Sequence, residues 1–176
     1  NEKCKTLDEK EYSLFDDMVV ISDDKNLHGI GGLMGGLDSS CSLKTQNVFL
    51  EVALFDSISI TKTGRKLNLQ SDARYRFERG IDNTSIEWGV DIATQMILDL
   101  CGGTVSEIVT DKIKNKELNK LIYDSNLTLK NGGINIDVNQ QINILKKLGF
   151  NSKPLKDSKI EIIIPSFRPD INDAAD

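Results

Sequence analysis

The chain has 176 residues, 39% of them hydrophobic, and a formal net charge of −5 at pH 7. This length fits one domain, or one domain and part of another, with enough apolar side chains for a core. The negative charge argues against a surface that coats nucleic acid, although local basic contacts are compatible with it. Because Cys4, Cys41 and Cys101 lie far apart and are odd in number, we expect reduced thiols in a cytoplasmic protein. No apolar run is long enough to cross a bilayer, no signal-peptide pattern is present, and a chain that begins with Asn1 is expected to be a fragment.

The first half of the chain is predicted to form short strands separated by polar turns. Runs of β-branched and other apolar residues, bounded by Asp, Asn and Gly, are typical of strands. Within residues 1–17 we expect a short hairpin anchored by Leu7, Tyr12 and Leu14. The elements expected after it are strands over residues 18–21 and 27–34, a polar loop over 37–44 and, as the strongest strand candidate, residues 47–55.

Helices are predicted from their capping residues. Asp, Ser and Thr side chains accept hydrogen bonds from the first free amides of a helix, and glycine often ends one. Thr84 and Glu87 have the spacing of a capping box. The predicted helices begin at the caps Asp56, Ser71 and Thr84, and end near Leu69, at Gly80 and before Gly102, respectively.

A second unit is expected after a polar linker. Residues 111–120 are rich in lysine and follow a predicted strand over 104–109. Further strands are expected over residues 122–129 and 160–164. Between them an amphipathic helix over 137–148 would turn Ile142, Leu145 and Leu148 inward and end at Gly149.

Several motifs then occur together in an order that matches one family. They are GGLMGG over residues 31–36, TQNVFLE over 45–51, SDA over 71–73, RFERGID over 76–82 and PSFRPDI over 165–171. On these residues the chain resembles the beta subunit of bacterial phenylalanine–tRNA ligase. Each motif alone is weakly specific, but the ordered set covers nearly the whole chain.

The resemblance implies an α+β fold with two domains. Residues 1–110 would be the latter part of the editing domain, a mixed sheet with packed helices. Residues 111–120 would be the linker, and residues 121–176 a truncated winged-helix-like domain.

The resemblance also implies a function for the whole enzyme and a share of it for this region. The whole enzyme would attach phenylalanine to tRNA(Phe) in the cytoplasm with ATP and Mg²⁺, as an alpha2-beta2 tetramer, without a membrane. This region would hydrolyse mischarged Tyr-tRNA(Phe), although the fragment alone is expected to be inactive. The alternative is a non-catalytic RNA-binding or scaffolding module. An unrelated metal-dependent hydrolase is disfavoured because the sequence has no histidine–carboxylate cluster.

The candidate site residues come from the same resemblance, which assigns no catalytic residue to this region. The implied editing pocket consists of Gly31, Gly32, Glu51, Ser71 and Ala73. Glu51 would accept the para-hydroxyl of tyrosine, since a buried acceptor left unpaired by phenylalanine discriminates strongly. The alternative interpretations are a strand-end glutamate bonded to backbone or arginine, a tight glycine bend, and a helix cap with a packed alanine.

The chain has two further groups of charged residues, one in a short predicted helix and one near residue 176. Of the cluster in the short helix, Arg74 is expected on a solvated face, whereas Arg76, Glu78 and Arg79 would brace the pocket. The resemblance assigns Asp170 and Asp176 to a magnesium site near the alpha-subunit contact, with further carboxylates beyond residue 176. Carboxylate oxygens suit Mg²⁺, but an acidic loop is the alternative.

Overall fold

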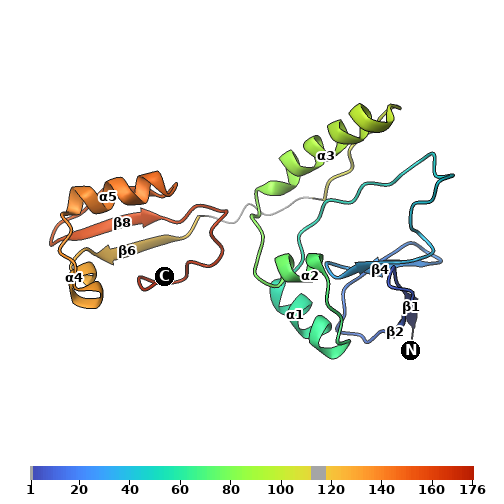
Figure 1. Ribbon diagram of the computed structural model, residues 1–176, viewed down its shortest axis with the longest axis horizontal. Helices are drawn as coiled ribbons and strands as arrows, with labels where there is room; N and C mark the ends of the chain where they lie inside the picture. The colour runs from blue at the N-terminus through green and yellow to red at the C-terminus, as the bar shows by residue number, and fades with distance from the viewer. Residues whose placement is uncertain (1, 112–117) are drawn as a thin grey trace. The chain divides into compact units, whose positions relative to one another are not determined.

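The computed structural model describes residues 2–111 and 118–176. The chain divides into two compact units, Asn1–Thr110 and Asp111–Asp176, each with a small sheet or sheets and helices (Figure 1). Most of the predicted linker 111–120 lies outside the described residues. In the described part of the chain, no helix combines the length and apolar character needed to cross a membrane.

The first unit contains two small antiparallel sheets. Its strands are β1 (Lys3–Lys5), β2 (Glu11–Ser13), β3 (Val20–Ser22), β4 (Leu27–Ile30) and β5 (Met34–Gly35). The β1–β2 hairpin and the β3–β4–β5 sheet are linked by a bridge between Thr6 and Gly36. The predicted mixed sheet is therefore wrong for the described residues, where every strand pair is antiparallel. In the first unit the reason is that short connections join the paired strands, whereas parallel pairs need a long crossover.

Two short helices complete the core of this unit. The predicted caps of α1 (Ser57–Lys66) and α2 (Asp72–Phe77) are confirmed, since Asp56 accepts from the Ser59 amide at 2.7 Å and Ser71 from the Arg74 amide at 3.0 Å. Burial of apolar side chains from the sheets and from the α1–α2 region stabilises the unit. The buried core consists of Cys4, Leu14, Ile30, Leu33, Ile60 and Leu69.

The remaining part of the first unit is far less buried. Helix α3 (Ser85–Cys101) is confirmed, but its capping box is not, because the Thr84 hydroxyl donates to Asp82 rather than capping the helix. The predicted strands 47–55 and 104–109 are wrong, since both segments lack regular secondary structure. A strand needs a hydrogen-bonded neighbour, and no described strand pairs with either segment.

The second unit is built on one antiparallel sheet in the order β6–β8–β7. Its elements are β6 (Lys120–Asp124), α4 (Leu127–Gly132), α5 (Val138–Lys147), β7 (Asn151–Pro154) and β8 (Lys159–Ile163). Helix α5 contributes Ile142 to a core with Phe150 and Ile160. The prediction that Leu148 points inward is wrong, since it is 56% exposed. It lies six residues after Ile142, and a 3.6-residue repeat turns that position away from the core face.

Candidate functional site

The glycine-rich turn between β4 and β5 is shaped by close packing. Gly32 has φ +67°, and a Cβ there would lie 2.6 Å from Ile60 Cδ1. A Cβ on Gly31 would lie 2.8 Å from Phe55 Cε1. Side chains are therefore excluded at both positions, and the backbone itself forms the surface that meets Phe55.

Ser71 joins this turn to helix α2. Its hydroxyl donates to the Leu33 carbonyl at 2.6 Å and accepts from the Arg74 amide at 3.0 Å. The Ser71 hydroxyl thus both caps α2 and links it to the glycine turn, although Ser71 and Leu33 are far apart in sequence. Ala73 is half-buried in the first turn of the same helix.

Phe55 is a member of this cluster that the motifs did not indicate. Its ring stacks edge-to-face on Phe77 of α2, with the centroids 5.2 Å apart. It also lies beside the position that a Gly31 side chain would occupy. The sequence carries a signal for it, because Phe55 precedes the cap Asp56 and Ile60 follows that cap by four residues, which is the spacing of a hydrophobic staple.

The Glu51 carboxylate makes no hydrogen bond to this cluster. The residue is exposed and sits in the irregular segment before Phe55. No hydrogen bond or ion pair joins its carboxylate to another described residue, so the alternative of a backbone- or arginine-bonded glutamate is not observed. Partial desolvation by its surroundings raises the pKa of Glu51 above its ordinary value.

The structure therefore brings the glycine turn and the start of α2 together and leaves the Glu51 carboxylate unengaged. Neither the cavity beside β1 nor the cavity beside α5 is lined by any of the predicted pocket residues. That these residues share one pocket remains a prediction.

Arg74 is the buried member of the charged cluster. It is 7% exposed, and its Nη1 donates to the Leu69 carbonyl at 2.6 Å while its Nε lies 3.1 Å from Glu78 Oε2. Gly64 of α1 is required beside it, because a Cβ there would overlap the guanidinium. The prediction of a solvated Arg74 is wrong, since its helix packs against α1 on that side.

The other two arginines of the cluster are exposed. Arg79 stacks on the Tyr75 ring at 3.8 Å and lies 2.9 Å from Glu78 Oε1, and Arg76 is also at the surface. The buried contacts that hold α2 are consequently made by Arg74 with Glu78. The prediction that Arg76 and Arg79 make such contacts is wrong, whereas Glu78 takes part in them.

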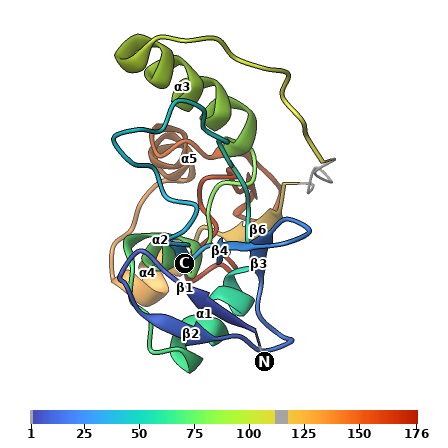
Figure 2. The same cartoon turned by 90° about the vertical axis from the view of Figure 1, so that its right-hand side faces the viewer.

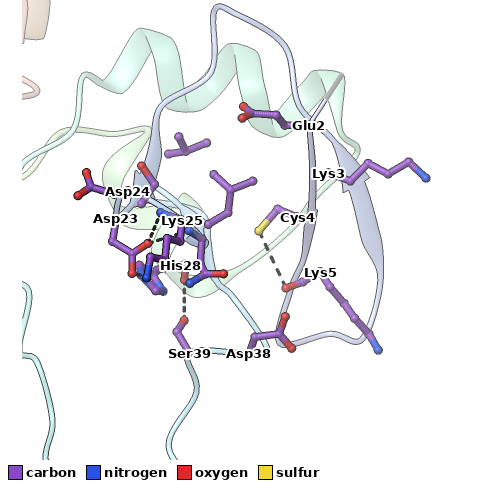
Figure 3. Close-up of a pocket in the computed structure, with 14 residues that line it drawn as sticks. Glu2, Lys3, Cys4, Lys5, Asp23, Asp24, Lys25, His28, Asp38 and Ser39 are labelled. Atoms are coloured by element: carbon purple, nitrogen blue, oxygen red, sulfur yellow. Dashed lines mark hydrogen bonds and ion pairs between the residues drawn. The ribbon is translucent and has the colours of Figure 1, made fainter.

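A polar cavity of about 620 Å³ lies between β1 and the turn that joins β3 to β4 (Figure 3). In it the Asp23 carboxylate accepts from the amides of Lys25 and Asn26, both at 2.7 Å, and lies 2.9 Å from His28 Nε2. These donors, the two amides first, lower the pKa of Asp23 to about 2. The carboxylate is thus used to close the turn.

This turn predicts a change of stability with pH. A lowered pKa means that the stabilisation is present above the ordinary value near 4 and is lost as the pH falls toward about 2. Asp23→Asn should therefore lower the melting temperature at pH 7, and its difference from wild type should shrink between pH 4 and pH 2. Asp24→Asn in the same turn is the control. A difference that stayed constant down to pH 2 would contradict the assignment.

The two aspartates assigned to magnesium are engaged by other groups. Arg168 donates from Nε and Nη2 to Asp170 at 2.8 and 2.7 Å, and the amides of Asn172 and Asp173 donate to Asp176 at 2.8 and 3.1 Å. These bonds lower the pKa of both carboxyls. Within residues 2–111 and 118–176 no group of three or more His, Cys, Asp or Glu could hold a metal. The residues present therefore do not fit a complete Mg²⁺ site.

We expect no stoichiometric Mg²⁺ binding by the 176-residue chain in a calorimetric titration. Mg²⁺ needs near-octahedral oxygens and gives up its water reluctantly, and Arg168 already neutralises Asp170. Arg168→Ala frees that carboxylate and is the matched variant. Tight binding by the wild-type chain, abolished by Asp170→Asn, would show that a site is complete in this chain.

Comparison with known proteins agrees with this architecture. Residues 1–102 match the B3/4 domain family, and residues 124–176 match the tRNA synthetase B5 domain. These two domains in this order define a chain of the tRNA synthetase class.

Relatives that match nearly the whole chain are phenylalanine–tRNA ligase beta subunits. That of Wolbachia sp. subsp. Brugia malayi is 40% identical over 99% of this chain, that of Novosphingobium aromaticivorans 42% over 97%, and that of Mesorhizobium japonicum 39% over 99%. The chain therefore belongs to the phenylalanine–tRNA ligase beta subunit family, as its motifs predicted. It spans only 21–22% of the length of these relatives.

Proposed function

We propose that this chain is part of an ATP-dependent ligase that attaches phenylalanine to tRNA(Phe), and that its first unit forms one side of a proofreading site. The reaction at that site is hydrolysis of tyrosine from mischarged Tyr-tRNA(Phe). The observation that carries the proposal is the 2.6 Å bond from Ser71 to the Leu33 carbonyl, which holds the start of α2 against the glycine turn. The names of the relatives support the ligase, and the family-like motifs over residues 31–36, 45–51 and 71–73 support the site.

The chemistry of the site follows from the groups on either side of this bond. The backbone of Gly31 and Gly32, whose side-chain positions are occupied by Phe55 and Ile60, would form the floor of the site, and Ala73 would leave depth for the ring of the aminoacyl group. Phe55 supplies an apolar edge for an aromatic ring, and such pairs add about 0.5–1.5 kcal/mol beyond burial. The carboxylate of Glu51, which has no partner of its own among the described residues, would accept the tyrosine hydroxyl. These residues bind and orient the substrate, and none of them is assigned as a nucleophile.

The other activities and partners of the enzyme are part of the same proposal. ATP-dependent charging, with Mg²⁺, is assigned to the alpha subunit of an alpha2-beta2 tetramer in the cytoplasm. The second unit, in which α4 and α5 precede the β7–β8 hairpin, is proposed to be winged-helix-like and to support the assembly.

Glu51→Ala in the full-length subunit, assembled with its alpha partner, tests the proposal. We expect release of tyrosine from Tyr-tRNA(Phe) to fall roughly 10- to 100-fold, which corresponds to loss of one hydrogen bond to a charged acceptor. Charging with phenylalanine should be unchanged. Glu11→Ala, at an exposed ion pair on β2, is the control.

Two results would contradict the proposal. If the wild-type enzyme does not release tyrosine, the alternative of a non-catalytic RNA-binding or scaffolding module is favoured. If Glu51→Ala releases tyrosine at the wild-type rate, Glu51 does not recognise the hydroxyl.

A further inference from the structure

Helix α2 displays an aromatic ring and a guanidinium group that are stacked on each other at the surface. Tyr75 is 59% exposed, and the guanidinium carbon of Arg79 lies 3.8 Å from the centroid of its ring. Arg79 Nη1 donates to the Tyr75 carbonyl at 2.7 Å and lies 2.9 Å from Glu78 Oε1, so this arginine is held in place. No described residue accepts a hydrogen bond from its Nε or Nη2. A fixed ring and a cation with unused donors are thus presented side by side.

This stack starts one helical turn beyond the residue that links α2 to the glycine turn. Ser71, Tyr75 and Arg79 are spaced by four residues, and the Tyr75 amide donates to the Ser71 carbonyl at 3.0 Å. Residues four apart lie on the same side of a helix, about 6 Å from each other along its axis. Because Ser71 bonds the Leu33 carbonyl, the stack leads from the proposed pocket onto the exposed surface.

Positive charge is concentrated on the two helices around this stack. Helix α2 lies beside α1 in both views (Figures 1 and 2), and Arg74 packs against Gly64 of α1. Residues 57–80 contain six basic and two acidic residues, whereas the whole chain has a net charge of −5. Five of the basic residues are exposed, namely Lys62, Arg65, Lys66, Arg76 and Arg79. A positive region on an otherwise acidic chain attracts a polyanion to one place.

On the basis of the proposed function, we infer that Tyr75 and Arg79 bind the single-stranded 3′ end of the tRNA that carries the amino acid to be removed. The Tyr75 ring stacks on an unpaired base, and Arg79 donates to the adjoining phosphate. Aromatic rings and arginines hold single-stranded RNA in this way. Since the amino acid is esterified to the terminal ribose, a nucleotide held one helical turn from Ser71 brings the amino acid to the pocket. The alternative is a side-chain pair that stabilises only the helix.

The first test measures kcat/KM for deacylation of Tyr-tRNA(Phe) by the full-length subunit assembled with its alpha partner. We expect Tyr75→Leu to lower kcat/KM about 10-fold, because one base loses its stacking partner. Arg79→Ala should lower it by about as much. Tyr75→Phe keeps the ring and should retain the wild-type value, whereas a role of the phenol hydroxyl would not survive this change.

Arg76→Ala is the matched control for Arg79→Ala. It removes the same charge from an exposed position of the same helix, but its guanidinium stacks on no ring in the described structure. It should leave kcat/KM within about twofold. A melting curve of each variant shows whether the enzyme remains folded. Equal losses for Arg76→Ala and Arg79→Ala, or wild-type deacylation by a folded Tyr75→Leu enzyme, would overturn the inference.

The second test does not depend on hydrolysis. Uncharged tRNA(Phe) with 2-aminopurine as its 3′-terminal base is added to the same assembled enzyme, because stacking quenches the fluorescence of this base analogue. We expect strong quenching by the wild type and by Tyr75→Phe, and at least about twofold higher emission with Tyr75→Leu. Equal quenching by all three would overturn the inference. An enzyme that shows the expected difference but releases no tyrosine would support the RNA contact and contradict the proposed proofreading reaction.

Discussion

Ala73→Trp is expected to reduce tyrosine release from Tyr-tRNA(Phe) to the uncatalysed background while leaving phenylalanine charging within about twofold, because overpacking acts locally. Ala73 is half-buried in the first turn of α2, next to the group that bonds the glycine turn. An indole there would fill the space proposed for the tyrosine ring. The measurement is deacylation of Tyr-tRNA(Phe) by the full-length subunit assembled with its alpha partner.

Arg76→Trp provides the matched control for this substitution. Arg76 lies on the same helix and is exposed, so the same bulky side chain should leave both reactions unchanged. A melting curve of each variant shows whether the helix remains folded. Deacylation at the wild-type rate by a folded Ala73→Trp enzyme would remove Ala73 from the pocket.

Arg74→Ala is expected to lower the free energy of unfolding of the first unit by about 2–4 kcal/mol, as is typical when one partner of a buried charge pair is removed. The substitution leaves the Leu69 carbonyl without its donor and Glu78 without its buried partner. It also opens a space beside Gly64 of α1. Urea unfolding of the chain, followed by circular dichroism, measures the loss.

Arg76→Ala is the control, two residues further along α2. As an exposed arginine it should change the unfolding free energy by no more than about 0.5 kcal/mol. Arg74→Lys keeps the charge but cannot reach the Leu69 carbonyl and Glu78 from one planar group, so an intermediate loss is expected. Equal effects of Arg74→Ala and Arg76→Ala would show that the buried geometry of Arg74 does not stabilise the unit.

The turn at Asp23 depends on local contacts, whereas the burial of Arg74 depends on tertiary contacts. The Asp23 turn depends on amides two and three residues away, so its chemistry is encoded locally. The burial of Arg74 depends on a glycine of another helix, and an arginine in a short charged helix gives no local sign of it.

The sequence by itself determined the features that depend on neighbouring residues and on motif order. The caps Asp56 and Ser71 and the long helix rest on contacts within a few positions, and the hairpin near the start pairs residues no more than ten positions apart. The ordered motifs also identify the family without reference to the fold.

Only the tertiary structure decided the features that depend on distant partners. It showed the bond between Ser71 and Leu33, the packing of Phe55 on the glycine turn and the burial of Arg74. It also showed that residues 47–55 and 104–109 are not strands in this chain, although their sequences favour that state. The physical reason is that a cap is satisfied by its own helix, whereas a strand or a buried charge exists only if another segment supplies the hydrogen bonds and the cover.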